Sequence, residues 1–267
     1  MTQHNNLSSR IEADDLIDSC LAFFEVVTVA LAGSFLTHWA FRSIDLSGQQ
    51  ILENTFQLFV FMVSEASLTL LLIIFFLRLR GDRLNRLGWI WENSRREILL
   101  GIAIVPVLFA CTLGISNFFR VVFPQYATTT NPILELVRER GDLILFLISS
   151  IYVGGIKEEI QRAFVLDRFE CHIGTVLVKF WTKILCLKIV VNDKTNRRVG
   201  IGFGLFLWTL FFGLGHAIQG IDNAFGAGIL GLLFGLLYIW RRNLAAPIVA
   251  HALYDIITLM AFRGFLS

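Results

Sequence analysis

The sequence predicts an all-α membrane protein, a polytopic helix bundle of about seven transmembrane helices. Of its 267 residues, 55% are hydrophobic and only 16% are charged, and the mean hydropathy is +0.68. A typical soluble domain has about 25% charged residues. The apolar residues gather into runs of about 20, the length that an α-helix needs to cross a bilayer. The net charge of +2 offers no basic surface for nucleic acid, so we expect membrane lipids and no nucleic acid as partners.

The apolar runs give seven predicted spans, and an eighth could form over 173–191. We interpret 173–191 instead as an amphipathic helix in the interface, because Lys179, Lys183 and Lys188 fall on roughly one face. The polar residues 1–15 lack the basic and short apolar regions of a cleaved signal, so the first span is expected to be retained. The predicted spans are 20–41, 56–77, 98–118, 143–166, 201–218, 224–240 and 245–262.

Basic residues gather in alternate loops, which the positive-inside rule places in the cytoplasm. These loops follow the second, fourth and sixth spans and include Arg80, Arg168 and Arg242. The N-terminus is then cytoplasmic. We expect residues 1–142 to hold transmembrane helices 1–3 and their loops. Residues 143–267 would form a second unit of helices 4–7, with a basic cytoplasmic insert near 171–200. A multi-pass protein of the bacterial inner membrane is expected; the endoplasmic reticulum membrane is the alternative.

An acid pair and an arginine interrupt the fourth span: Glu158, Glu159 and Arg162. A charge at bilayer depth costs roughly 2.5–3.5 kcal/mol on insertion scales, so such residues indicate a functional site. Either glutamate can pair with Arg162, at i to i+4 or i to i+3 of a helix. The glutamate left over is suited to act as general base on a water molecule. The alternative is an ion pair that only holds helices together.

Two histidines and a further acid lie in the later spans: His216, His251 and Asp255. His251 and Asp255 share one helix face, so Asp255 could fix the histidine tautomer or join it in binding a metal. Two histidines with a carboxylate match the ligands of a catalytic zinc, so His216, His251 and Asp255 are candidate zinc ligands, although a metal-free mechanism would use the same side chains. His216 falls deeper in its span than Glu158, so the fifth helix is expected to extend into the cytoplasm.

These residues, in this order on successive helices, resemble the CAAX prenyl protease and bacteriocin-processing family of intramembrane proteases, also called the Abi family. The resemblance covers residues 154–267. It implies an intramembrane endopeptidase in which Glu158 activates water, with Glu159 and Arg162 completing the acid motif. His216 would be its partner or a metal ligand, and His251 with Asp255 a ligand or oxyanion-stabilising pair. The substrate would be a peptide or membrane protein.

Two features differ from the family pattern. Only Ile160 and Gln161 separate the acid pair from Arg162, where the family usually has three residues. If Arg162 is taken as the anchor, Lys157 occupies the place of the first acid. Asp255 stands where an asparagine is often found.

Two other classes of function use similar residues. A proton-coupled membrane transporter also needs intramembrane glutamate and histidine. A catalytically inactive membrane scaffold could contain the same residues without using them in a reaction. The ionisable residues concentrate in the C-terminal half, which favours the protease over a carrier built from two repeats. Glu25 and Glu65 in the first two spans would either line a water or substrate path or make neutral hydrogen bonds to neighbouring helices.

Overall fold

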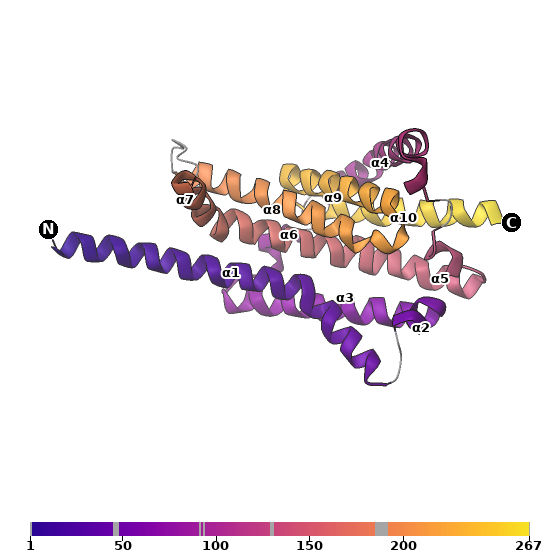
Figure 1. Ribbon diagram of the computed structural model, residues 1–267, viewed down its shortest axis with the longest axis horizontal. Coiled ribbons are helices and arrows are strands. Elements are labelled where there is room, and N and C mark those ends of the chain that lie inside the picture. Colours follow the sequence, from indigo (N-terminus) through magenta and orange to yellow (C-terminus); the bar gives the residue numbers. More distant parts are fainter. Residues whose placement is uncertain are drawn as a thin grey trace.

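Every regular element among the described residues of the computed structural model is a helix, which confirms the predicted all-α class. The structure describes residues 2–44, 48–90, 92, 94–128, 131–184 and 192–266. The long helices form one elongated bundle (Figure 1). The elements are α1 (Thr2–Arg42), α2 (Gly48–Glu53), α3 (Thr55–Leu79), η1 (Leu84–Leu87), α4 (Ser94–Val122), η2 (Pro124–Tyr126), η3 (Leu134–Leu136), α5 (Arg140–Ser149), the π-helix η4 (Ser150–Glu158), α6 (Glu159–Arg168), the π-helix η5 (Phe169–Ile173), α7 (Gly174–Ile184), α8 (Asp193–Gly215), η6 (Ala217–Gln219), α9 (Ile221–Arg241) and α10 (Ala245–Leu266).

In the part of the chain that the structure describes, six helices are long and apolar enough to cross a membrane, and each overlaps one predicted span. The predicted span 201–218 overruns its helix, because α8 ends at Gly215. The remaining prediction, 143–166, falls on α5, η4 and α6, which follow one another without a break but are individually shorter. The chain is therefore a multi-pass membrane protein.

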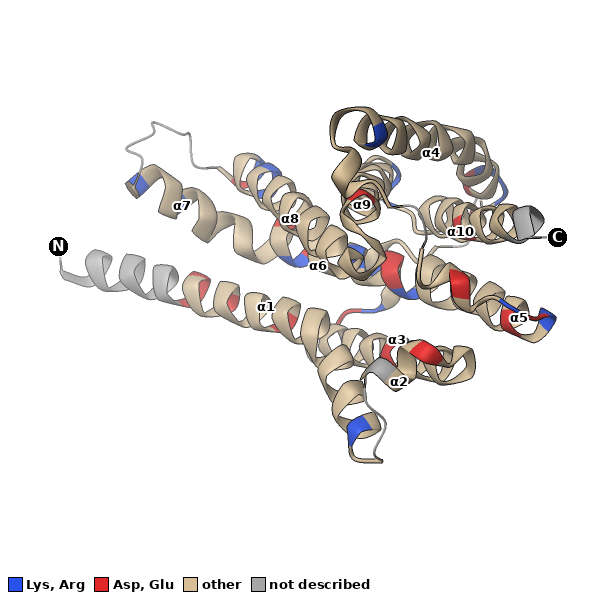
Figure 2. Cartoon of the chain, turned by 45° about the vertical axis from the view of Figure 1, so that its right-hand side comes forward, with Lys and Arg blue, Asp and Glu red and all other residues tan. Residues whose placement is uncertain are grey.

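The run of α5, η4 and α6 passes through the middle of the bundle. In Figure 1, α1 and α3 lie on one side of it and α8 and α9 on the other, and α10 packs against η4. One buried cluster joins these layers and contains Ile73 of α3, Phe164 of α6, Leu205 of α8 and Tyr238 of α9. Most of the ribbon in Figure 2 is uncharged, with charged segments on α6 and on the neighbouring α1 and α3. The acid motif thus lies in a mostly apolar bundle, with other charged residues on the neighbouring α1 and α3.

Gly231 and Gly235 of α9 allow α8 to approach closely. A Cβ atom at Gly231 would lie 2.9 Å from Cδ1 of Phe212, and one at Gly235 would overlap Leu205. Both neighbours belong to α8. Small residues at such positions let helices in membranes pack backbone to backbone.

The predicted helix over 173–191 is a helix over Gly174–Ile184, where it forms α7. The rest of that prediction, with Lys188, lies outside the described residues, and the interfacial position of α7 stays a prediction. The next helix, α8, begins at Asp193, and the side chain of Asn192 caps it by accepting from the Thr195 N–H at 2.9 Å. The fifth predicted span therefore does extend on its N-terminal side; the location of that extension in the cytoplasm stays a prediction.

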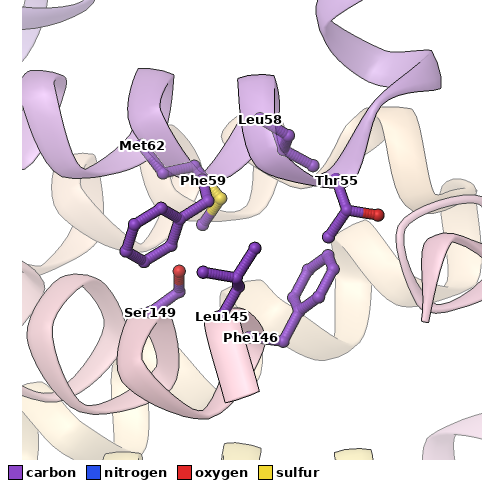
Figure 3. A pocket seen from close by; sticks show the side chains of 7 residues that line it. All are labelled: Thr55, Leu58, Phe59, Met62, Leu145, Phe146 and Ser149. Atoms are coloured by element: carbon purple, nitrogen blue, oxygen red, sulfur yellow. The ribbon is translucent and has the colours of Figure 1, made fainter. Parts of the chain in front are cut away.

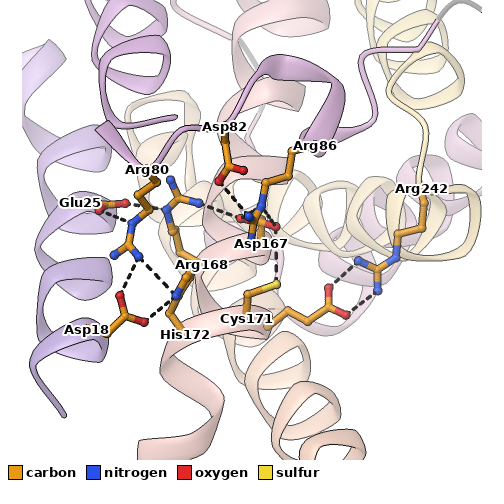
Figure 4. Close-up of polar contacts among 11 residues, drawn as sticks. Asp18, Glu25, Arg80, Asp82, Arg86, Asp167, Arg168, Cys171, His172 and Arg242 are labelled. Carbon is orange, nitrogen blue, oxygen red and sulfur yellow. Dashed lines mark hydrogen bonds and ion pairs between the residues drawn. The ribbon is translucent and has the colours of Figure 1, made fainter. Parts of the chain in front are cut away.

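Ion pairs connect α1 to α6 and to the chain after α3 (Figure 4). Arg168 of α6 is fully buried and contacts Glu25 of α1 at 2.5 Å and Asp167 at 2.8 Å. Arg80 contacts the same Glu25 at 2.6 Å and Asp18 at 2.7 Å. Burial acts to lower the pKa of Arg80, but its bonds to Asp18 and Glu25 outweigh this effect, so the pKa lies above its usual value. Charges that leave water must be paired in this way to avoid a large penalty.

This cluster corrects two expectations. Arg168 is not in a loop, because α6 continues to Arg168 and buries its side chain completely. Glu25 makes ion pairs with two arginines, so it neither lines an open path nor forms only neutral hydrogen bonds.

A narrow hollow lies between α3 and α5 and has no room for a water molecule (Figure 3). None of its lining residues is a predicted site residue, and we attribute the hollow to packing between the two helices. The residues that line the hollow are Thr55, Leu58, Phe59, Met62, Leu145, Phe146 and Ser149.

Asp142 caps the N-terminus of α5 by accepting from the backbone N–H groups of Glu139 at 2.9 Å and Arg138 at 3.0 Å. Burial acts to raise its pKa, but these bonds outweigh it, so the pKa lies below its usual value. We expect Asp142→Ala to cost about 1 kcal/mol of unfolding free energy at neutral pH. Because the folded pKa is lowered, this contribution is present above the unfolded pKa of about 3.9 and is lost as the pH falls through the folded value. Unfolding in detergent micelles at several pH values measures this; an equal difference between the two proteins at every pH would contradict it.

Candidate active site

Glu158 and Glu159 lie where the central helix changes its geometry. Glu158 is the last residue of the π-helix η4, and Glu159 is the first residue of α6. A π-helix closes i to i+5 hydrogen bonds, and such segments are frequent at functional sites. The Glu158 side chain is 18% exposed, whereas that of Glu159 is fully buried. The two adjacent acids therefore have different surroundings and can serve different purposes.

The glycines of η4 allow α10 to come close. A Cβ atom at Gly155 would lie 3.0 Å from Cβ of Ala252, and one at Gly154 would overlap Oδ2 of Asp255. Any side chain at Gly154 would also come within 3.6 Å of Nε2 of His251. The glycine pair thus leaves the space in which His251 and Asp255 meet the acid motif.

His251 lies among three carboxylates. Its Nδ1 is 2.7 Å from Oε1 of Glu159, and because an ionised carboxylate only accepts, this contact keeps a proton on Nδ1. Its Nε2 faces Oε2 of Glu158 at 3.7 Å and Oδ2 of Asp255 at 3.8 Å. The ring also stacks on Phe234 of α9, with centroids 4.5 Å apart. Glu159 and Phe234 therefore fix the ring, and Nε2 is left to face the two partly exposed acids.

Arg162 pairs with Glu159, one helical turn earlier, and both side chains are fully buried. The guanidinium also lies over the rings of Phe212 and Phe234, at 5.1 and 5.4 Å from their centroids. Cation–π contacts of this kind gain strength when the cation is desolvated. Of the two pairings that the sequence allows, the structure has the one with Glu159, which leaves Glu158 without the arginine.

His216 follows directly after α8. Its Nδ1 lies 2.8 Å from the carbonyl oxygen of Phe212, and its ring packs 4.7 Å from the Phe212 ring. Phe212 in turn lies 6.2 Å from the ring of His251. His216 is therefore at the edge of the site, separated from His251 by Phe212, and within range of a charge–charge interaction with Asp255.

The candidate zinc ligands do not form a metal site as they lie. Among the described residues, no three His, Cys, Asp or Glu side chains lie together in a way that could hold a metal ion. Nδ1 of His251 binds Glu159 and Nδ1 of His216 lies against a backbone carbonyl, so Nε2 of both histidines remains available. Histidines that bind zinc commonly engage their other ring nitrogen in this way, and the zinc expectation stays a prediction for metal analysis.

One comparison with known proteins gives a match that spans the elements carrying the acid motif and both histidines. Residues 139–257 match the family described as type II CAAX prenyl endopeptidase Rce1-like. Over these residues, called the Rce1-like segment below, the chain is similar to that family. The resemblance expected from the acid and histidine motifs is thereby confirmed, and the match supports an intramembrane CAAX protease. Neither the curated proteins nor the solved structures contain a significant match to this chain.

Outside the Rce1-like segment, Glu65 on α3 makes a contact that the sequence did not reveal. Its Oε2 lies 3.0 Å from Nζ of Lys157, the residue before Glu158. Glu65 is therefore in an ion pair, which neither of its two expected roles included. The signal was visible as a lysine in an apolar run, which requires an acid as partner. Lys157 contacts α3, and Glu158 and Glu159 are the acids that face His251.

Proposed function

We propose that this chain is an intramembrane endopeptidase that hydrolyses a peptide bond near the cytoplasmic membrane face by a glutamate-based mechanism. The observation that carries the proposal is the pair of Glu158 and His251, with Oε2 and Nε2 3.7 Å apart in a mostly buried site. This separation exceeds a direct hydrogen bond, so a water molecule can contact both groups. The Rce1-like match supports the same reaction class.

Glu158 acts as the general base in this proposal. It removes one proton from the water, and the hydroxide oxygen attacks the carbonyl carbon of the scissile bond. Glu158 is suited to this because Arg162 binds Glu159 instead and leaves the Glu158 carboxylate free to accept. When the tetrahedral intermediate collapses, the carbon–nitrogen bond breaks and Glu158 returns its proton to the leaving amine.

His251 stabilises the oxyanion. Its ring carries a proton on each nitrogen, so that Nδ1 donates to Glu159 while Nε2 donates to the developing negative charge. The carboxylates of Glu159 and Asp255 compensate the positive charge of the ring. His216, with Nδ1 directed at a carbonyl, keeps Nε2 available for a second contact to substrate or water.

The substrate in this proposal is a peptide or membrane protein that enters from the lipid. In this proposal the site lies toward the cytoplasmic face of a bacterial inner membrane, and the N-terminus is cytoplasmic. The basic loops support this orientation. Protease turnover is measured by reconstituting the purified protein in liposomes with membrane-anchored CAAX peptides, prenylated and unmodified, and identifying products by mass spectrometry. A proton-coupled carrier would instead acidify the liposome lumen without cleavage, and a scaffold would do neither.

Metal analysis tests the metal-free form of the proposal. We expect the detergent-purified protein to contain far less than one zinc per chain and to keep its turnover after dialysis against a chelator. The double variant His216→Ala, His251→Ala serves as the control, because it removes both candidate nitrogen ligands. About one zinc per chain that is lost in this variant would contradict the metal-free mechanism and indicate Asp255 as a further ligand.

A further inference from the structure

The π-helix that carries Glu158 is attached to α3 at two points. Near its C-terminal end, Nζ of Lys157 lies 3.0 Å from Oε2 of Glu65. Near its N-terminal end, the Tyr152 hydroxyl lies 2.9 Å from the hydroxyl of Ser67. On its other side, the same π-helix contacts α10 through Gly154 and Gly155. The segment is therefore held between α3 on one side and α10 on the other.

The Glu65 side chain is itself fixed by its neighbours. Its other oxygen, Oε1, accepts from Thr69 at 3.1 Å and from Ser34 of α1 at 3.3 Å. The side chains of Lys157 and Glu65 are only 10% and 11% exposed. A buried ion pair whose remaining lone pairs are satisfied has a defined geometry. Lys157 thus has one acid at one place on α3 as its partner.

We propose that Glu65 and Lys157 are positioning residues that set the orientation of Glu158 toward Nε2 of His251. The inference rests on the proposed function of Glu158. Lys157 and Glu158 are neighbours in one π-helical turn, so the ion pair fixes the rotation of the backbone that carries the base. This gives α3, which lies outside the Rce1-like segment, a part in the reaction without contact to the substrate.

The test compares the neutral variants Glu65→Gln and Lys157→Gln with the conservative variant Lys157→Arg. The matched control is Glu97→Gln, which removes a buried acid from another ion pair between helices, with Arg241, that joins α4 to α9. We expect both neutral variants to lower kcat by about 10- to 100-fold with little change in KM, since small displacements of reacting groups cost this much. Lys157→Arg should restore most of the turnover, and Glu97→Gln should leave kcat unchanged.

Amide hydrogen exchange gives a second readout that needs no turnover. Exchange of residues 150–158 should be faster in Glu65→Gln than in the wild type, and unchanged in Glu97→Gln. Equal kcat and equal exchange in Glu65→Gln and Glu97→Gln would overturn the inference. If the wild type cleaves no peptide, the proposed function fails; the exchange comparison then decides the positioning role by itself, with unchanged exchange in Glu65→Gln overturning it.

Discussion

Glu158→Gln is expected to lower kcat for peptide cleavage by about 10²- to 10⁴-fold, the usual effect of removing a general base. Glutamine has nearly the same shape but cannot take a proton from water. KM should change little, because the variant removes an interaction needed only during the reaction. Kinetics in liposomes measures both constants, and binding of an uncleaved peptide to the variant measures substrate affinity directly.

The matched control for this experiment is Glu135→Gln, an exposed acid on η3 that contacts none of the site residues. Its kcat should equal that of the wild type. If Glu158→Gln kept full activity, Glu158 would not be the general base, and another group would have to take the proton from water. Loss of substrate binding together with turnover would indicate that Glu158 binds the substrate.

The central elements of the site could be predicted because charge in a membrane is costly. An acid motif and two histidines in apolar spans need partners, and the structure brings Glu158, Glu159 and His251 together from helices far apart in the sequence. The same cost identifies Arg162 as the partner of one acid. This cost does not indicate whether Arg162 pairs with Glu158 or with Glu159.

The different surroundings of Glu158 and Glu159 follow from the π-helical turn. A single-residue change in helical register rotates every later side chain, and the hydrophobic pattern of 143–166 is compatible with either an α-helix or a π-helix. The glycines at 154 and 155 indicate a close approach, but they do not say that Asp255 is the group that approaches. Only the packing of α10 against η4 decides this.

Contacts between segments far apart in the sequence could not be predicted either. Glu25, Glu65 and Arg168 each have several possible partners of opposite charge. Arg168 in particular follows an apolar run and precedes a basic stretch, so the sequence predicts a position at the start of a loop. The continuation of α6 and the approach of α1 place it in the interior instead.

Arg162→Met is expected to be the most destabilising single substitution in the site. It removes a fully buried cation and leaves Glu159 as an uncompensated charge, which costs about 3–5 kcal/mol when a buried pair is broken. The contacts with Phe212 and Phe234 are lost as well. Unfolding in mixed micelles measures the change in free energy.

The double variant Glu159→Gln, Arg162→Met separates two costs: the loss of the arginine side chain, and the burial of a Glu159 charge that has no partner. Removing both charges leaves no buried carboxylate without a partner, so the double variant should be more stable than Arg162→Met alone. Arg241→Met, which breaks the more exposed pair with Glu97, should cost much less than either. An Arg162→Met protein as stable as Arg241→Met would mean that water reaches Glu159, and the site would then be too wet for His251 to depend on that acid for its orientation.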